Sequence, residues 1–206
     1  MVRRSGAAAV SVADAREEIL AVAEVQLRRF GVDKVTVVDI AKALGMSHAN
    51  VYRFFPSKSA IIHAVVGRWV AETVAICEAA MRGRRTAAKR IEAMLVAIFS
   101  CKRAKLANDP EVFQSYTAMV EVAPEVIADY TDRLAAFLAR VVQEGIESGE
   151  FAPTDAQGAA RQIWQATERF HHPVLVRHYQ SIDDENALKR VVAMLTRGLA
   201  ATSVPP

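Results

Sequence analysis

Cysteine is scarce in this chain of 206 residues, and its two copies, Cys77 and Cys101, form no C-x-x-C pair. Their separation argues against a disulfide framework and against a zinc site built on cysteine, and it fits a reducing, cytoplasmic setting. Long apolar runs are also missing, because Arg or Glu interrupts the richest of them, whereas a membrane helix needs roughly 18 apolar residues in a row. We therefore expect neither a membrane-spanning segment nor a membrane partner.

Sequence motifs of common enzymes are absent too. The chain has no G-x-S-x-G, no G-x-G-x-x-G and no Walker phosphate loop, and its nine glycines mostly stand where helices are expected to end. No set of Ser, His and Asp can be assigned from order alone. The prediction is that the protein is not an enzyme and uses neither a cofactor nor a metal ion.

Positive charge is concentrated near the N-terminus. The formal net charge is +3, from 26 Lys and Arg against 23 Asp and Glu. The first sixty residues hold nine basic and six acidic residues, and the remaining chain holds 17 of each. Counterion release and Coulomb attraction would draw a polyanion such as DNA to that end, although a chance scatter of three charges gives the same balance.

Apolar residues recur at helical spacing along almost the whole chain, and no stretch alternates for long enough to make a convincing sheet. The prediction is an all-α protein. Ser11 and Asp14 offer a capping box for the first helix. Gly31 and Gly45 end the first two helices, and Pro56 stops the third. The expected helices cover residues 11–30, 36–44, 47–55, 57 to past 78, 87–107, 110–121, 124–148, 155–180 and 185–201.

Residues 36–58 form a helix–turn–helix pattern. Ile40, Ala41 and Leu44 give its first helix an apolar face, and Val51 packs inward from its second helix. A recognition helix of this kind places its first turn against base edges in the major groove, while its flanks hold phosphates. The positions left to face outward are Ser47, His48, Ala49, Tyr52 and Arg53.

These residues resemble the TetR family of bacterial transcriptional regulators. The N-terminal signature of that family reads approximately T-x-x-x-I-A-x-x-x-G-x-S-x-x-x-x-Y-x-x-F-x-x-K, and this sequence matches every fixed letter from Thr36 to Lys58. With the resemblance, the expected division of the chain is a flexible basic arm at 1–10, a helix–turn–helix DNA-binding domain at 11–58, a helical effector-binding and dimerisation domain at 59–202 and a tail at 203–206.

The resemblance also implies roles for single positions. His48 and Ala49 would face bases. Phosphate contacts would come from Thr36, Ser47, Tyr52 and Lys58.

One position departs from the family pattern. Many members place a phosphate-binding His two residues after the Tyr, and here Phe54 stands at that position. Arg53 is the candidate to bind that phosphate instead. For Phe54 and Phe55 we expect core packing, which is also the alternative for Tyr52.

In the family, an effector enters a cavity among the central helices and moves the fourth helix, which joins the cavity to the DNA-binding head. A mainly apolar lining with a few polar atoms would suit a small hydrophobic or aromatic molecule. Ordinary core packing is the alternative for every candidate. The candidate lining residues are Trp69, Phe99, Phe113, Tyr116, Trp164 and His171.

The segment from Glu168 to His178 has two open interpretations. Glu168 and His172, and His171 and His178, have helical spacings that would allow a metal site. Pro173 must kink or restart the helix there, so histidines that satisfy freed carbonyls or bind a polar ligand are the favoured interpretation.

A second basic region lies between residues 82 and 105. A solvated helix face is expected, with an anionic effector or a DNA-adjacent surface as alternatives. The region contains Arg82, Arg84, Arg85, Lys89, Arg90, Lys102, Arg103 and Lys105.

The last expected helix carries an apolar stripe, which needs a partner. The resemblance implies that the last two helices of each subunit pair into a four-helix bundle and place two heads about 34–36 Å apart, one turn of DNA. Packing inside the chain is the competing account, and both can hold for different residues. The stripe consists of Leu188, Val191, Val192, Leu195 and Leu199.

With the resemblance, these features predict a ligand-responsive transcriptional repressor that binds palindromic double-stranded operator DNA as a homodimer. A small hydrophobic or aromatic effector would release it. The alternatives are an all-helical protein-binding module and a small-molecule enzyme without DNA binding. A protein-binding module would need neither a short capped recognition helix nor a charge bias toward it.

Overall fold

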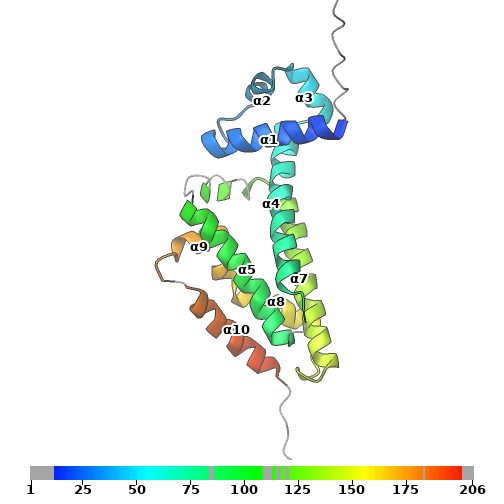
Figure 1. Cartoon of the computed structure of the whole chain (residues 1–206), viewed down its shortest axis with the longest axis vertical. Coiled ribbons are helices and arrows are strands. Elements are labelled where there is room, and N and C mark those ends of the chain that lie inside the picture. Colours follow the sequence, from blue (N-terminus) through cyan, green and yellow to red (C-terminus); the bar gives the residue numbers. More distant parts are fainter. Residues whose placement is uncertain are drawn as a thin grey trace, which may run out of the picture.

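The chain folds into helices arranged as a small head on a larger helical body (Figure 1). The computed structural model describes residues 12–83, 86–108, 113–114, 117–118, 121–182 and 184–200. Within these ranges the only extended pairing is an isolated bridge between Phe151 and Ala200. The predicted all-α fold is confirmed for this part of the chain.

The head is built from α1 (Val12–Phe30), α2 (Val37–Ala43) and α3 (His48–Phe54). Its three helices contribute Ile19, Leu27, Ile40 and Val51 to an apolar core that continues along α4 into the body. The turns after α1 and α2 need glycine, because Gly31 and Gly45 have φ of 79° and 67°, a left-handed conformation that other residues rarely adopt. The predicted ends of these two helices are therefore confirmed.

A long helix, α4 (Lys58–Ala80), leaves the head and runs into the body (Figure 1). Ser57 caps it by accepting a hydrogen bond from the Ala60 N–H at 3.0 Å. Among the described residues, α4 is the one helix long and apolar enough to cross a membrane, but half of its apolar stretch is buried within the protein, as in a core helix.

The body consists of helices that pack on α4 and on one another. In chain order these are α5 (Ala87–Asn108), α7 (Pro124–Glu147), α8 (Ala156–Ala166), the 3-10 helix η1 (Glu168–Phe170), α9 (Pro173–His178) and α10 (Glu185–Leu199). α5 contacts α4, α7, α9 and α10, and α8 packs on α7. α5 therefore lies at the centre of the body (Figure 1).

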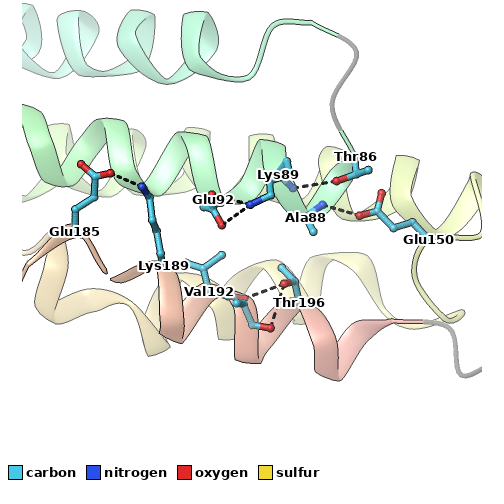
Figure 2. A network of polar contacts seen from close by, with 10 residues as sticks. Thr86, Ala88, Lys89, Glu92, Glu150, Glu185, Lys189, Val192 and Thr196 are labelled. Atoms are coloured by element: carbon cyan, nitrogen blue, oxygen red, sulfur yellow. Dashed lines mark hydrogen bonds and ion pairs between the residues drawn. The ribbon is translucent and has the colours of Figure 1, made fainter. Parts of the chain in front are cut away.

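Polar contacts hold the start of α5 and the neighbouring α10 in place (Figure 2). The Glu150 carboxylate accepts hydrogen bonds from the Ala87 and Ala88 N–H groups at 2.6 and 2.9 Å, and so satisfies donors that the first turn of α5 leaves free. On α10, Lys189 pairs with Glu185 one turn earlier. Glu150, which follows α7 in the chain, thus helps to cap α5.

The single helix predicted over residues 155–180 is wrong, because the structure breaks it into α8, η1 and α9. The Thr167 hydroxyl donates to the Ile163 carbonyl at 2.8 Å, and Pro173 has no N–H with which to continue a helix. The described residues within the predicted helix 110–121 are helical. The expected arm at 1–10, the Ser11 cap and the tail at 203–206 lie outside the described residues.

Candidate functional site

The outward face of α3 is the first part of the site. Val51 is fully buried on the opposite face of the helix, as predicted. Tyr52 is 46% exposed, so core packing does not hold for its side chain, and its ring meets the His48 ring edge to face at 6.3 Å. The positions predicted to face outward are all exposed, namely Ser47, His48, Ala49, Tyr52 and Arg53.

The two short helices begin at side-chain caps. Thr36 and Asp39 form a capping box in which the Thr36 Oγ1 accepts from the Asp39 N–H at 3.2 Å and donates to the Asp39 carboxylate at 2.6 Å. The hydrogen bonds from Thr36 lower the pKa of Asp39. Ser47 accepts from the Asn50 N–H at 3.2 Å, which leaves its hydroxyl hydrogen for a phosphate. Thr36, by contrast, already donates its hydroxyl hydrogen within the head.

Arg16 on α1 holds the end of α3, a role that nothing in the sequence pattern indicated. Its Nη1 donates to the Phe54 carbonyl at 3.2 Å, and its guanidinium lies 4.2 Å from the centroid of the Phe55 ring. Phe55 is 1% exposed, as expected for a core residue. The orientation of the recognition helix α3 is thus fixed by α1 as well as by the core.

The two remaining predicted phosphate contacts flank the end of α3. Arg53 is exposed, and its guanidinium lies 5.5 Å from the ring centroid of Phe54, which is partly buried against the core. Lys58 opens α4 and is partly exposed. Arg53 can therefore reach toward solvent from the helix that also carries Tyr52.

Trp69 lies where α1 crosses α4. Its Nε1 donates to the Glu24 carboxylate at 2.8 Å, and Glu24 also pairs with Arg28 at 2.7 Å. Arg68 reaches Glu17 of α1 at 3.5 Å. The structure therefore places Trp69 at the joint between the head and α4, apart from the other predicted effector residues.

A second joint links α4 to the body. His63 Nε2 lies 3.3 Å from the Val122 carbonyl and 3.9 Å from the Glu125 carboxylate, just before and within α7. Further along α4, Glu72 pairs with Lys105 of α5 at 3.1 Å. Movement of α5 or α7 thus has direct contacts through which to move α4.

The structure brings several of the predicted effector residues together where α8 ends. The Trp164 and His171 rings stack at 3.7 Å, and His171 Nε2 donates to the Trp164 carbonyl at 3.0 Å. Phe99 of α5 meets Phe170 edge to face at 5.8 Å. Phe113 is buried with Leu106 and Val176, and Tyr116 lies outside the described residues.

Hollows in the described part of the chain lie elsewhere. One of about 570 Å³ is in the head, beside Gln26, Phe30 and Lys34. Another of about 560 Å³ lies beside α5 and α10, near Val96 and Lys189. Neither is lined by the predicted effector residues.

Lys102 corrects the expectation of a solvated basic face between residues 82 and 105, because it is only 6% exposed. It lies four residues after Ile98 and four before Leu106, in register with the buried stripe of α5, and this spacing was the signal in the sequence. Burial lowers the pKa of Lys102 to about 8.

His171 is buried near this lysine. Burial lowers the pKa of His171 to about 4, the hydrogen bond to the Trp164 carbonyl opposes this effect, and the charges of Lys102 and His172 add to it. His171 is therefore neutral at pH 7. His178 is exposed and meets Tyr179 edge to face at 4.6 Å, and among the described residues no three His, Cys, Asp or Glu side chains gather as a metal site.

The apolar stripe of α10 divides between two environments. Leu188 and Val192 are 0% and 1% exposed in the core of the single chain, so their burial is the intrachain packing that the sequence left open. Val191, Leu195 and Leu199 are partly buried at the edge of that core, and Met194 is 62% exposed.

Two family models match the chain. One, described as "Bacterial regulatory proteins, tetR family", matches residues 19–65, which include α2 and α3. The other, described as "Tetracyclin repressor-like, C-terminal domain", matches residues 87–192, more than half of the chain.

The curated relatives are similar over part of their length. Nucleoid occlusion factor SlmA of Actinobacillus pleuropneumoniae is 32% identical over 73 residues, which are 35% of this chain and 36% of that protein. SlmA of Haemophilus influenzae is 27% identical over 136 residues, 65% of this chain and 62% of that protein. The match to the first of these relatives thus spans about a third of its length.

Solved structures share the fold across nearly the whole chain. A TetR/AcrR family regulator of Thermobifida fusca has a TM-score of 0.64 at 24% identity and covers 90% of this chain and 98% of its own. The fatty acid degradation regulator FadR of Bacillus halodurans has a TM-score of 0.64 at 17% identity and covers 98% and 99%. At these identities the likeness establishes the fold alone.

Proposed function

Because the chain belongs to the TetR family of bacterial transcriptional regulators, we propose that it is a repressor that binds palindromic operator DNA as a homodimer and leaves it when a small effector binds. In this proposal the protein acts in the cytoplasm and catalyses no reaction. Its partners are operator DNA, a second copy of the chain and the effector.

The division of α3 into two faces carries this proposal. Val51 is fully buried, while Tyr52 and His48 stand exposed on the other side of the same helix. A helix held in this way can enter the major groove without unfolding the head. His48 and Ala49 would then face base edges, and the phosphate contacts would come from Ser47, Tyr52, Arg53 and Lys58. Thr36 would join them by turning its hydroxyl hydrogen from Asp39 to a phosphate.

A homodimer has two heads, and each head can bind one half-site of a palindromic operator. One short helix reads only a few base pairs, so two heads about 34–36 Å apart bind a palindrome more selectively than one. We place the exposed side of α10 in the interface, where Met194 is exposed and Val191 and Leu195 are partly so. The buried Leu188 and Val192 would support this face from behind.

The effector would act through α4. A ligand held near Phe99, Trp164 and His171 would bias the position of α5 and the α8–α9 connection, and the contacts of Glu72 and His63 would pass this bias to α4. A ligand shifts such an equilibrium only by its different affinities for the two arrangements. By linkage, operator DNA then weakens effector binding by the same factor by which the effector weakens DNA binding.

A second candidate is a role in nucleoid occlusion, the function in the names of the curated relatives. In that role the same head would act across the nucleoid rather than at a few promoters. Chromatin immunoprecipitation distinguishes the two, since a repressor gives a few promoter-proximal peaks and a nucleoid-wide factor gives many dispersed ones.

A gel shift with fragments of neighbouring promoters at two salt concentrations tests the proposal. We expect a specific complex whose affinity falls steeply with salt, because the phosphate contacts release counterions. A protein-binding module or an enzyme gives no shift on any fragment, and that result would end the proposal.

A further inference from the structure

Three arginines line a hollow of about 480 Å³ in the body, where α4 ends. Arg82 follows the last turn of α4, Arg90 lies near the start of α5, and Arg140 lies on α7. Figure 1 places this end of α4 away from the three helices of the head. None of the residues proposed to contact DNA or the effector lines the hollow. The other lining residues are Glu78, Met81, Gly83 and Phe137.

Arg90 uses only part of its hydrogen-bonding capacity. Its Nη1 donates to the Glu144 carboxylate. Its Nε is buried and has no hydrogen-bond partner among the described residues. The side chain is only 19% exposed, so water does little to satisfy the remaining donors of the guanidinium. A buried donor without a partner is costly, and a bound acceptor is one way to satisfy it.

The other two arginines are free to turn toward a ligand. Arg82 is exposed, and its side chain forms no ion pair or hydrogen bond with any residue that the structure describes. Arg140 is 60% exposed, and its Nε lies 3.9 Å from the Glu144 carboxylate, which is too long for a hydrogen bond. Neither side chain has to break a short contact in order to reach the hollow.

Carboxylates offset only part of this positive charge. Glu144 is shared between Arg90 and Arg140, and Glu78 is exposed where it lines the hollow beside Arg82. Two carboxylates therefore face three guanidinium groups, and one positive charge remains uncompensated. This excess favours an anionic ligand over a neutral or cationic one.

The chemistry of the guanidinium group selects the kind of anion. Its planar fork of N–H donors matches the oxygens of a phosphate, and a phosphomonoester carries about −1.5 to −2 charge at pH 7 with three acceptor oxygens. Such a group can accept hydrogen bonds from several arginines at once. Met81, which is 5% exposed, and Phe137, which is partly buried, add an apolar wall to the same hollow.

We infer that this hollow binds a small phosphomonoester with an apolar or aromatic group. The phosphate lies among the guanidinium groups of Arg82, Arg90 and Arg140, and the apolar group lies against Phe137 and Met81. The inference goes beyond the proposed function and does not rest on it. A failure of operator binding would leave the binding of phosphate measurable.

The test compares ligands that share a ring and differ in charge. Phenyl phosphate, benzoate and phenol are titrated separately into the full-length protein at pH 7 by calorimetry. We expect phenyl phosphate to bind about tenfold or more tightly than either of the others, because it has the larger charge and more acceptor oxygens. Vesicles that contain phosphatidic acid offer the same group on a lipid surface. The inference is wrong if phenyl phosphate is not preferred, or if only the vesicles bind.

Variants of the arginines locate the binding. Arg82→Gln and Arg90→Lys should each weaken the binding of phenyl phosphate by about fivefold or more. Arg90→Lys keeps a cation beside Glu144 and removes the guanidinium fork. Arg133→Gln is the matched control, since it removes an exposed arginine of α7 that does not line the hollow, and it should bind like the native protein.

A variant with the opposite effect separates lost binding from a damaged fold. Glu78→Gln removes a carboxylate from the hollow and should bind phenyl phosphate about two- to fivefold more tightly. Glu18→Gln, which removes an exposed carboxylate of α1 in the head, should not. Arg82→Gln and Arg90→Lys proteins that unfold cooperatively and still bind phenyl phosphate as tightly as the native protein would overturn the inference.

Discussion

Single polar residues in the head stabilise the helices that they are also proposed to use on DNA. Thr36 donates to and accepts from Asp39, and Ser47 accepts from the Asn50 N–H. Replacing such a cap by alanine costs about 0.5–2 kcal/mol of stability, so a loss of DNA binding in those variants has two causes. Tyr52 and Lys58 make no cap and are the cleaner residues for testing phosphate contacts.

His171 predicts how the stability of the protein depends on pH. Its pKa is about 4 in the folded protein, below the ordinary value of 6.5 that it has when unfolded. The neutral residue therefore stabilises the fold fully above about pH 6.5, and this contribution falls as the pH drops toward 4. The expected loss is about 1.4 kcal/mol per pH unit within that window.

Urea unfolding at pH 7 and pH 5 checks this expectation. His171→Gln keeps an amide N–H that can donate to the Trp164 carbonyl but does not titrate. The native protein should lose about 2 kcal/mol more free energy of unfolding than the variant between the two pH values. Equal losses would mean that His171 is accessible to protons in the folded state.

Helices of the body meet closely at one glycine and leave space at another. A Cβ at Gly145, near the end of α7, would lie 2.4 Å from the Phe151 ring and 2.9 Å from the Ala87 side chain. Gly67, within α4, has no neighbouring atom within 4 Å of the same position. Close packing therefore requires a glycine at position 145, whereas position 67 has room for a side chain.

Alanine at these positions should change stability in opposite directions. Gly67→Ala is expected to raise the free energy of unfolding by about 0.5–1 kcal/mol, because alanine has the higher helix propensity. Gly145→Ala is expected to lower it by about 1–3 kcal/mol through overpacking. Chemical unfolding of both variants measures the difference, and a stabilised Gly145→Ala would show that α7 and Phe151 separate easily.

The sequence predicted those elements whose boundaries are local. Thr36, Gly45, Ser47 and Pro56 start or end the short helices through their own chemistry, so the helix–turn–helix was found without tertiary information. The break after Ala166 was missed, because an alternative hydrogen bond of a threonine does not by itself predict a helix end. The sequence also did not predict the sites that join segments distant in the chain.

Lys102 illustrates that second limit. Its helical spacing placed it on the apolar stripe of α5, yet a lysine in a basic region is usually solvated. Its closeness to His171 depends on how α5 packs against residues about seventy positions later, which the spacing does not give. The joints at Trp69 and His63 are of the same kind, because each links segments far apart in the chain.

In the molecule as a whole, α10 covers α5, and its exposed side is the interface that we propose for a second copy of the chain. Leu188 and Val192 are buried against the core, and Met194 is exposed. Removing α10 would therefore expose core residues and take away the proposed interface together.

Truncation before Asp184 tests this double role. We expect the shortened chain to be a monomer or an aggregate, because an apolar face that loses its cover associates nonspecifically. Met194→Glu is the milder variant, since it alters the exposed face and leaves Leu188 and Val192 in place. Sedimentation of both shows their assembly, and a truncated chain that stays a discrete dimer would put the interface elsewhere.

The salt dependence of operator binding in variants tests whether the exposed face of α3 binds DNA. Fluorescence anisotropy gives the affinity of the native protein, Tyr52→Phe, Lys58→Ala and His48→Ala for an operator fragment at several salt concentrations. Lys89→Ala, which removes an exposed cation from the body, is the control and should behave like the native protein.

Tyr52→Phe and Lys58→Ala should weaken binding to all sequences alike, and Lys58→Ala should lower the slope of log affinity against log salt by about 0.9 for each phosphate that the lysine no longer neutralises. His48→Ala should instead reduce discrimination at one base pair of each half-site by about 1–3 kcal/mol. A triple variant of these three residues that binds the operator as tightly and as selectively as the native protein would contradict the account.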